Sequence, residues 1–542
     1  MAKRFMAPCV LLFALAAGPL MCVAQSSQEG STAGSPAHLG KVDFPTSCSL
    51  AVQPVFEKAV ALMHSFQYQE AQQTFDQAAA LEPNCAMAHW GKAMVLHEQL
   101  WTLPDKKALS KGHKESELAQ KLHPGTPKEQ GFVAAAAAYY QKNSKISYSD
   151  RNKAYSAALE KLHEQMPDDV EVGSFYALSL VTLAEDDVDS LENQKKAIAI
   201  LQPLLEKYPD HPGVAHYLIH AADRPELAAL GLEAARRYAA IAPDSPHALH
   251  MPSHIFTRLG LWQESIDSNI ASARAAQKAG MPGEQLHASD YLEYAYLQTG
   301  QDQQAKSVLD QMVANKTGLP NYFAGVYATA AMPARYVVET HRWAEAAKLE
   351  VPSGSPGGKL SWAEATVYYA RALGSAHTGD IEGARQAIQK LEADRDTLTQ
   401  LQETYWAGQV EIQRREAAGI LASAQGKKDE ALGLLRSAAD IEDASEKHPV
   451  TPGPVKPARE LLGEFLLTLD KPADALVAFE STLQRSPNRF NALYGAATAA
   501  QTAGQREKAR HYFQALVAVS DPLSQRPELS IARSYLQEVA RK

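Results

Sequence analysis

The sequence predicts an all-α protein built as an α-solenoid, and three observations support this fold class. From Val52 onward, apolar residues recur at three- and four-residue spacing, and no run alternates polar and apolar residues as a strand would. Pro and Gly interrupt the chain about every 15 to 20 residues. A pattern of small and large residues returns after 34 residues. With 542 residues, 45% of them hydrophobic and 21% charged, the chain is too long for one compact core and too apolar for wholesale disorder.

The first 24 residues are typical of a signal peptide. Lys3 and Arg4 form a cationic start, an apolar run follows from Val10 to Leu20, and small residues lead to Ala24. We expect cleavage before Gln25 and therefore an exported protein, periplasmic or extracellular. The apolar run is too short to span a bilayer comfortably, so the mature chain is not expected to span a membrane.

The cysteines add to this interpretation. Cys22 offers a lipid-anchored alternative, but Pro19, Leu20 and Met21 before it fit a lipobox poorly. Removal of the signal peptide leaves only Cys48 and Cys85, an even pair in a compartment that allows oxidation. We expect these two residues to form a disulfide; the alternative is two buried free thiols. Two cysteines are too few for a structural zinc site.

The repeat pattern places two small residues and one larger residue on the second helix of each helix pair, where small residues let antiparallel helices approach closely. The sets are Ala71, Phe75, Ala78; Ala197, Leu201, Leu204; Gly231, Ala235, Tyr238; Ser265, Asn269, Ser272; Ala475, Phe479, Thr482; and Ala509, Phe513, Leu516. In this pattern the chain resembles the tetratricopeptide repeat (TPR) superfamily. The resemblance implies a right-handed superhelix of helix-turn-helix repeats with a concave groove that binds a protein, a peptide or a small ligand.

Composition and the repeats together predict the domain organisation. Two Pro/Gly-rich breaks, Pro352 to Gly358 and His448 to Pro457, separate the repeats into groups. The expected parts are a signal peptide (1–24), a flexible leader (25–50), an N-terminal and central TPR-like array with a His-rich groove (51–350), further TPR-like helices (359–447), and a C-terminal TPR pair with an end helix (456–542).

Several short stretches resemble motifs of a group of exported bacterial TPR proteins that has no established activity. They are FPTSC at 44–48, NCAMAHWG at 84–91, HYLIHAAD at 216–223, HALHMPSHIF at 247–256 and HASDYLEYAYLQ at 287–298. This resemblance is more specific than the generic repeat, and it implies no reaction.

Histidines gather in one part of the array, where six of the 18 fall between His211 and His254. In the repeat register, His216 and His220 occupy positions 5 and 9 of one repeat, and His250 and His254 occupy the same positions of the next. Asp290 and Tyr294 take these positions in the following repeat, and His247 and His287 take position 2. Residues four apart share a helix face, and equivalent positions of stacked repeats face the same way, so we expect these eight side chains to form one patch.

Imidazole and carboxylate together suit a divalent transition metal such as zinc, iron, copper or nickel. We expect His216, His220, His250, His254 and Asp290 to be the ligands, with His247, His287 and Tyr294 lining the ligand-binding groove beside them. Two alternatives remain open: the histidines hydrogen-bond to one another and fill the groove, or they bind an anionic or peptide ligand directly.

Two details bear on this patch. Asp223 is a poorer ligand candidate than Asp290, because Pro225 and Glu226 after it indicate a helix N-cap with a capping box. Pro252, between His250 and His254, indicates either a kink within one helix or the start of a new helix.

The net charge and the missing motifs exclude several classes of function. Lys and Arg total 53 against 62 Asp and Glu, so the net charge of -9 gives no basic field for a nucleic acid. No His-Glu-x-x-His, phosphate loop or Gly-x-Ser-x-Gly motif is found. The sequence predicts an exported solenoid that binds a partner or ligand in its groove, with a transition metal as the most specific hypothesis. The alternative is a metal-dependent enzyme, a hydrolase or an oxidoreductase, that uses the same His/Asp patch. Catalytic residues are unknown.

Overall fold

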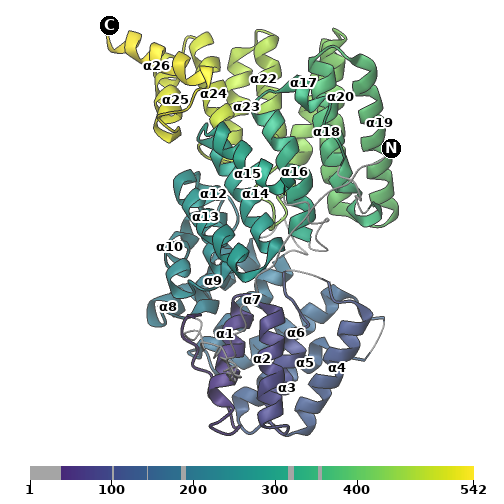
Figure 1. The fold of residues 1–542 in the computed structure, drawn as a ribbon, viewed down its shortest axis with the longest axis vertical. Coiled ribbons are helices and arrows are strands. Elements are labelled where there is room, and N and C mark those ends of the chain that lie inside the picture. The colour runs from purple at the N-terminus through teal and green to yellow at the C-terminus, as the bar shows by residue number, and fades with distance from the viewer. Residues whose placement is uncertain are drawn as a thin grey trace, which may run out of the picture. The chain divides into compact units, whose positions relative to one another are not determined.

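Helices make up the chain as the apolar periodicity predicts, in a computed structural model that describes residues 38–100, 103–142, 145–184, 191–314, 323–351 and 357–541 (Figure 1). The expected signal peptide with Cys22, the first part of the leader and most of the break at 352–358 lie outside these residues. The described part of the chain contains no strand, and none of its helices combines the length and hydropathy needed to cross a bilayer.

The first group of helices carries the N-terminal repeats and the irregular region after them. These helices are α1 (Gln53–His64), α2 (Tyr68–Leu81), α3 (Ala86–Met94), α4 (Lys106–Lys121), α5 (Pro127–Tyr139), α6 (Tyr148–Gln165), α7 (Val170–Ala184), α8 (Glu192–Lys207), α9 (Pro212–Ala222), α10 (Leu232–Ile241), α11 (Pro246–His250), α12 (Pro252–Leu259) and α13 (Trp262–Ala279). A short 3-10 helix, η1 (Ala228–Gly231), precedes α10.

The remaining helices complete the array. They are α14 (Pro282–Gln298), α15 (Asp302–Ala314), α16 (Phe323–Glu339), α17 (Trp343–Ala346), α18 (Ser361–His377), α19 (Ile381–Gln400), α20 (Thr404–Ala424), α21 (Lys428–Asp443), α22 (Ala458–Thr468), α23 (Pro472–Arg485), α24 (Phe490–Thr502), α25 (Arg506–Val519) and α26 (Pro527–Ala540). A 3-10 helix, η2 (Gly358–Leu360), precedes α18.

The packing is that of a TPR-like α-solenoid. Each helix packs on the next along the chain, and alternate helices such as α14, α16, α18 and α20 also pack on one another in turn. The residues of the 34-residue pattern lie at these contacts: Phe75 and Phe479 are fully buried. A β-carbon at Gly91 would lie 2.2 Å from the Phe75 ring, and one at Gly495 would lie 2.3 Å from the Phe479 ring. Glycine at these positions therefore permits the close helix approach that the pattern predicts.

The structure anchors residues 38–50, predicted as part of a flexible leader, to the helices through two buried side chains, Leu39 and Phe44, while most of the other residues of the segment are exposed. The Phe44 side chain is fully buried, and its ring centroid lies 5.1 to 5.8 Å from the ring centroids of Phe56, Trp90 and Phe132. The small and polar residues before Lys41 suggested a loose segment, but one large aromatic ring is enough to bind the segment after it to the core.

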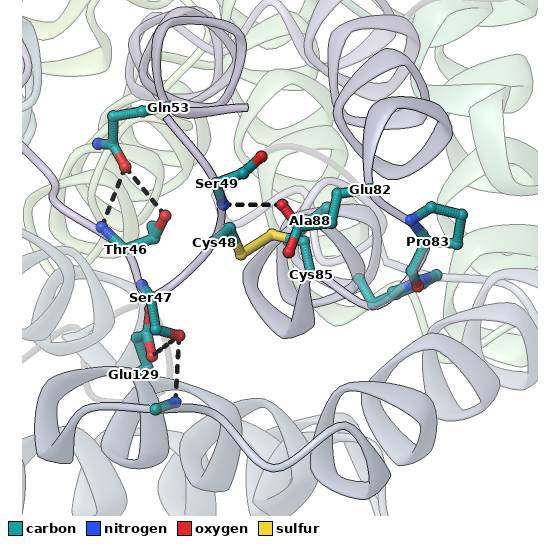
Figure 2. Close-up of a disulfide and its surroundings, with 12 residues drawn as sticks. Thr46, Ser47, Cys48, Ser49, Gln53, Glu82, Pro83, Cys85, Ala88 and Glu129 are labelled. Carbon is teal, nitrogen blue, oxygen red and sulfur yellow. Dashed lines mark hydrogen bonds between the residues drawn. A yellow bond between two sulfur atoms is a disulfide. The ribbon is translucent and has the colours of Figure 1, made fainter. Parts of the chain in front are cut away.

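The predicted disulfide between Cys48 and Cys85 is present, with a Cα–Cα distance of 5.3 Å (Figure 2). Two hydrogen bonds hold the same turn in place. The Ser49 backbone N–H donates to Glu82 at 2.7 Å, and the Ser47 hydroxyl donates to Glu129 at 2.7 Å. The disulfide therefore joins the N-terminal segment to the loop between α2 and α3.

The break after α21 is not an exposed linker. Residues 444–457, which we call the crossing segment, pack against α14 and α16: the Tyr291 hydroxyl donates to the Thr451 carbonyl at 3.0 Å, and the Tyr327 hydroxyl donates to the Gly453 carbonyl at 3.3 Å. The chain from His38 onward forms one compact unit, so the breaks at 352–358 and 448–457 do not separate domains.

Candidate metal centre

Six buried or half-buried imidazoles meet where α9, α11, α12 and α14 pack together. We call His216, His220, His247, His250, His254 and His287 the imidazole cluster. They fall into two triads, His216/His220/His247 and His250/His254/His287, and within each triad the candidate ligand atoms lie within 4.8 Å of one another. Ring centroids of His220 and His254, one from each triad, are 6.2 Å apart.

Pro252 lies between His250 and His254 of the second triad. The helix divides at Met251, with α11 ending at His250 and α12 beginning at Pro252, but Met251 keeps helical backbone angles (φ −52°, ψ −36°) and donates to the His247 carbonyl at 2.9 Å. The path is therefore that of one helix interrupted at Pro252, which is closer to the predicted kink than to a fresh start. The Nε2 atoms of His250 and His254 lie 3.1 Å apart across this point, the same separation as between His216 and His220 within the unbroken helix α9.

Oxygen atoms fix the protonation of both rings. His250 Nδ1 donates to Asn269 Oδ1 at 2.7 Å, because the Asn269 amide nitrogen is already committed to the Ser265 carbonyl. His254 Nδ1 donates to the Asp223 carboxylate at 3.0 Å. A neutral imidazole carries one proton. Both Nε2 atoms therefore present lone pairs to each other, with no proton between them.

The first triad shares this arrangement at one ring, His216. His216 Nδ1 donates to the His64 carbonyl at 2.6 Å, which leaves a lone pair on Nε2. The Nε2 atoms of His220 and His247 lie 3.1 and 3.2 Å from that atom. Two imidazole nitrogens thus converge on a single lone pair.

The surroundings keep these rings neutral. Burial lowers the pKa of the imidazole in His216, His220, His250, His254 and His287, and neighbouring imidazoles lower it further in His216 and His250. Although burial alone would raise the pKa of Asp223, the charges of Lys447 and Arg258 hold it well below its usual range. Asp223 is therefore an ionised acceptor for His254.

This geometry fits a transition metal. Metal-bound histidines usually donate their second N–H to a carboxylate, a carbonyl or a similar acceptor, as His216, His250 and His254 do here. Two nitrogens bound tetrahedrally at about 2.0–2.1 Å from one ion would lie about 3.3 Å apart. The separations of 3.1 to 3.2 Å between Nε2 atoms are close to this value.

Two of the predicted residues lie elsewhere. Asp290 was expected among the ligands, but its carboxylate accepts a hydrogen bond from Arg335 at 2.7 Å and is buried beside Glu293. Tyr294 was expected in the groove beside the metal, but its hydroxyl accepts a hydrogen bond from Arg489 at 3.0 Å. The register itself holds across the 40-residue offset, because His287 joins the second triad from position 2 as His247 joins the first. Asp290 and Tyr294, at positions 5 and 9 of the third repeat, lie instead against Arg335 of the following helix, α16.

His247 and His287, expected to line the groove beside the ligands, are members of the triads themselves. The His287 ring centroid lies 4.2 Å from that of His250. His287 and Tyr291 are thus the pair on α14 that faces the second triad, and Tyr291 stacks on His254 at 4.9 Å.

Sequence reasoning also missed Asp223 and Asn269. Asp223 is the C-cap residue of α9 and not the start of a helix, and its carboxylate binds His254, Arg258 and Lys447. The spacing of His254 and Arg258, one turn apart on α12, was the available signal for a shared carboxylate. Asn269 lies within a helix at a repeat position that the other repeats fill with an apolar residue, and its polar side chain there was the available signal.

A third group of histidines, unpredicted, lies next to the cluster. Glu171 on α7 accepts from His64 Nε2 at 2.9 Å and from His211 Nε2 at 3.0 Å, and we call these three residues the Glu171 network. His211 Nδ1 accepts the Val214 backbone N–H, so His211 must carry its proton on Nε2. Burial alone would raise the pKa of Glu171, but the two imidazoles lower it overall. The two hydrogen bonds that Glu171 accepts are thus supplied by imidazole protons of the network itself.

The comparisons with known proteins identify no family and only distant structural likenesses. No protein-family model matches the chain, and no curated protein matches it either. Among solved structures, the chain is similar to the human IFIT1 dimer with PPP-AAAA, at 14% identity and a TM-score of 0.35, over 87% of this chain and 91% of that one. It is also similar to the human IFIT1 dimer with m7Gppp-AAAA, at 15% identity and a TM-score of 0.37, over 88% and 92% of the two chains. No conclusion about function rests on likenesses this distant.

Proposed function

We propose that this protein is an exported TPR-like solenoid whose imidazole cluster binds a divalent transition metal. The observation that carries the proposal is the 3.1 Å contact between His250 Nε2 and His254 Nε2, both deprotonated because their Nδ1 atoms donate to Asn269 and Asp223. Two facing lone pairs repel each other, whereas a cation held between them would accept both lone pairs as ligands. Zinc, copper, iron and nickel all accept imidazole.

Export rests on the N-terminal pattern of residues 1–24 and is supported by the Cys48–Cys85 disulfide, which is the chemistry of an oxidising compartment. The likeness of several motifs to exported bacterial TPR proteins agrees with this. The TPR-like fold is compatible with a role in holding a partner or ligand along the solenoid.

The second candidate is a metal-dependent enzyme. Three protein ligands with an open position for water or substrate characterise catalytic zinc sites, whereas structural sites are closed by four. Each triad offers three imidazoles within the described residues. A metal that carries an exchangeable water would favour the enzyme.

The test is the metal content of the purified mature protein beside a His250→Ala/His254→Ala variant. Each protein is stripped with a chelator, loaded separately with zinc, copper and nickel, dialysed and analysed for bound metal. Removing the residue that accepts a hydrogen bond from a metal-bound histidine weakens metal binding about 10- to 100-fold. Removing two of the metal-binding histidines themselves should weaken metal binding more than about 100-fold.

A His113→Ala/His511→Ala variant serves as the matched control, since both residues lie outside the cluster. It should retain wild-type metal content. Thermal unfolding without metal checks that all three proteins fold. If the folded His250→Ala/His254→Ala variant keeps as much metal as the wild type, the proposal is wrong.

A further inference from the structure

A cavity of about 110 Å³ lies between α18, α20, α21 and the crossing segment, and it is distinct from the imidazole cluster. Its walls include four aromatic side chains, Tyr327, Tyr369, Tyr405 and Trp406. Tyr405 is 37% exposed, whereas Tyr369 is only 1% exposed. The aromatic wall thus runs from the surface to the interior.

Two carboxyl groups, Glu416 on α20 and Glu442 on α21, also line this cavity. Neither takes part in an ion pair within the described residues, although the cavity also contains cationic side chains. Those cations have carboxylate partners outside this pair: Arg258 binds Glu446 at 2.7 Å, Lys456 binds Glu460 at 3.1 Å, and Arg459 binds Asp440 at 2.8 Å. The other two cations of the wall also have partners: Lys447 binds Asp223 at 3.1 Å, and Arg485 donates to the Asp443 and Ser445 carbonyls. The cations are therefore paired, whereas Glu416 has no ion-pair partner within the described residues and Glu442 accepts only the Ala458 backbone N–H, at 2.8 Å.

Glu416 is the most informative of these residues. Its side chain is 1% exposed, and its Oε1 has no hydrogen-bond partner in the described part of the chain. Gln413 Oε1, one turn earlier on α20 and also in the cavity wall, lacks a partner as well. The Tyr369 hydroxyl in the same wall can donate to the Glu416 carboxyl group. Buried acceptors are normally satisfied, and the oxygens of Glu416 and Gln413 offer more acceptor sites than one hydroxyl can fill, so they indicate a ligand that supplies N–H donors.

The raised pKa values of Glu416 and Glu442 agree with the absence of an ion-pair partner for either acid within the described residues. Burial and the neighbouring Glu442 raise the pKa of Glu416 well above its usual range, and burial raises the pKa of Glu442 to about 7. The charge of Lys456 opposes the shift in Glu416, and the charges of Arg485 and Arg489 oppose it in Glu442, but burial outweighs them.

We propose that this cavity binds the protonated amino group of a small organic amine, with Glu416 and Gln413 accepting its N–H groups and Trp406 and the tyrosines facing its charge and its alkyl part. Aromatic faces attract organic cations, and a carboxylate supplies the hydrogen-bond acceptor. An anion would lack free cations to bind. A hydrated metal ion prefers more oxygen ligands than aromatic walls provide.

The experiment is calorimetric titration of the full mature protein with n-butylammonium chloride near neutral pH. Sodium butyrate and n-butanol, of the same length, test an anion and a neutral molecule. We expect n-butylammonium to bind, and butyrate and butanol to give no heat of binding. All titrations are repeated after chelator treatment, so that the result does not depend on the metal in the imidazole cluster.

Glu416→Gln removes the charge and keeps the shape, and it should weaken n-butylammonium binding at least about tenfold. Glu392→Gln, on the exposed face of α19, is the matched control and should bind like the wild type. Trp406→Leu should weaken binding several-fold, and it keeps the test decisive if Glu416→Gln does not fold. Tighter binding of butyrate, unchanged binding by the folded Glu416→Gln and Trp406→Leu variants, or no binding of n-butylammonium to the wild type would overturn the proposal.

Discussion

The Glu171 network and the imidazole cluster are neighbouring groups of buried histidines with opposite chemistry. In the Glu171 network, His211 Nδ1 accepts a backbone N–H, so its proton sits on Nε2 and points at a carboxylate. In the cluster, the Nδ1 atoms of His216, His250 and His254 donate to oxygen, so lone pairs face one another. The distances between polar atoms are similar in both. The difference teaches that the second nitrogen of each ring decides whether a histidine group needs a metal.

The largest expected effect is on the stability of the fold, and it comes from removing the disulfide, which lies outside both histidine groups. Cys48→Ser/Cys85→Ser opens a loop with a sequence separation of 37 residues, which should lower the free energy of unfolding by about 4 kcal/mol because the unfolded chain gains freedom. Urea unfolding measures the change. Metal content should stay at the wild-type level, since the disulfide lies outside both triads. Equal stability of the variant and the oxidised wild type would show that the bridge does not form.

Glu171→Gln should break the Glu171 network. The amide cannot accept from two imidazoles as an ionised carboxylate does, and loss of one partner in a buried pair costs about 3 kcal/mol. Metal content should be unchanged. Glu164→Gln, exposed on the neighbouring helix α6, should leave the free energy of unfolding within about 0.5 kcal/mol of the wild type. Loss of metal from a folded Glu171→Gln variant would contradict the division between the two groups.

The same substitution predicts a dependence on pH. Because the folded pKa of Glu171 is lowered, its contribution to stability is present above the pKa of an unfolded Glu, about 4.3. It is lost as pH falls through the folded value. The difference in unfolding free energy between the wild type and Glu171→Gln should therefore be constant from pH 7 to about 5 and shrink below about 4. A difference that grows toward acid pH would assign the opposite sign to the shift.

A smaller effect is expected at Asp223. Asp223→Asn replaces the acceptor that holds the proton of His254 on Nδ1, and metal affinity should fall about 10- to 100-fold. Competition with a coloured chelator measures this. Wild-type affinity in the folded variant would mean that the Asp223 carboxylate does not orient His254 for a metal.

The smallest effect is expected at Asp290, the acid that the repeat register placed among the ligands. Asp290 binds Arg335 and belongs to neither triad, so Asp290→Asn should change metal affinity by less than about twofold. The same chelator competition compares it with Asp223→Asn. A loss as large as that of Asp223→Asn would return Asp290 to the metal site.

Much of the fold follows from the sequence, because helix periodicity and the small/large pattern are local signals. The Cys48–Cys85 bridge followed from a count of cysteines in a chain that the N-terminal pattern predicts to be exported. The recurrence of His-x-x-x-His at 216–220 and 250–254 indicated which helix faces carry the imidazoles. That Asp290 is buried against Arg335 was not predictable, since 45 residues and an irregular insertion separate the two. Glu171 could not be found either, because α7 carries no repeat signature that sets its phase.

The most direct test of the account is a crystal structure of the zinc-loaded mature protein with anomalous data collected at the zinc edge. We predict an anomalous peak between His250 Nε2 and His254 Nε2, with those nitrogens about 2.0–2.1 Å from the ion, and no peak at Glu171. A zinc peak at Glu171, or a zinc-loaded crystal with no peak at either triad, would contradict the assignment of the imidazole cluster as the metal centre.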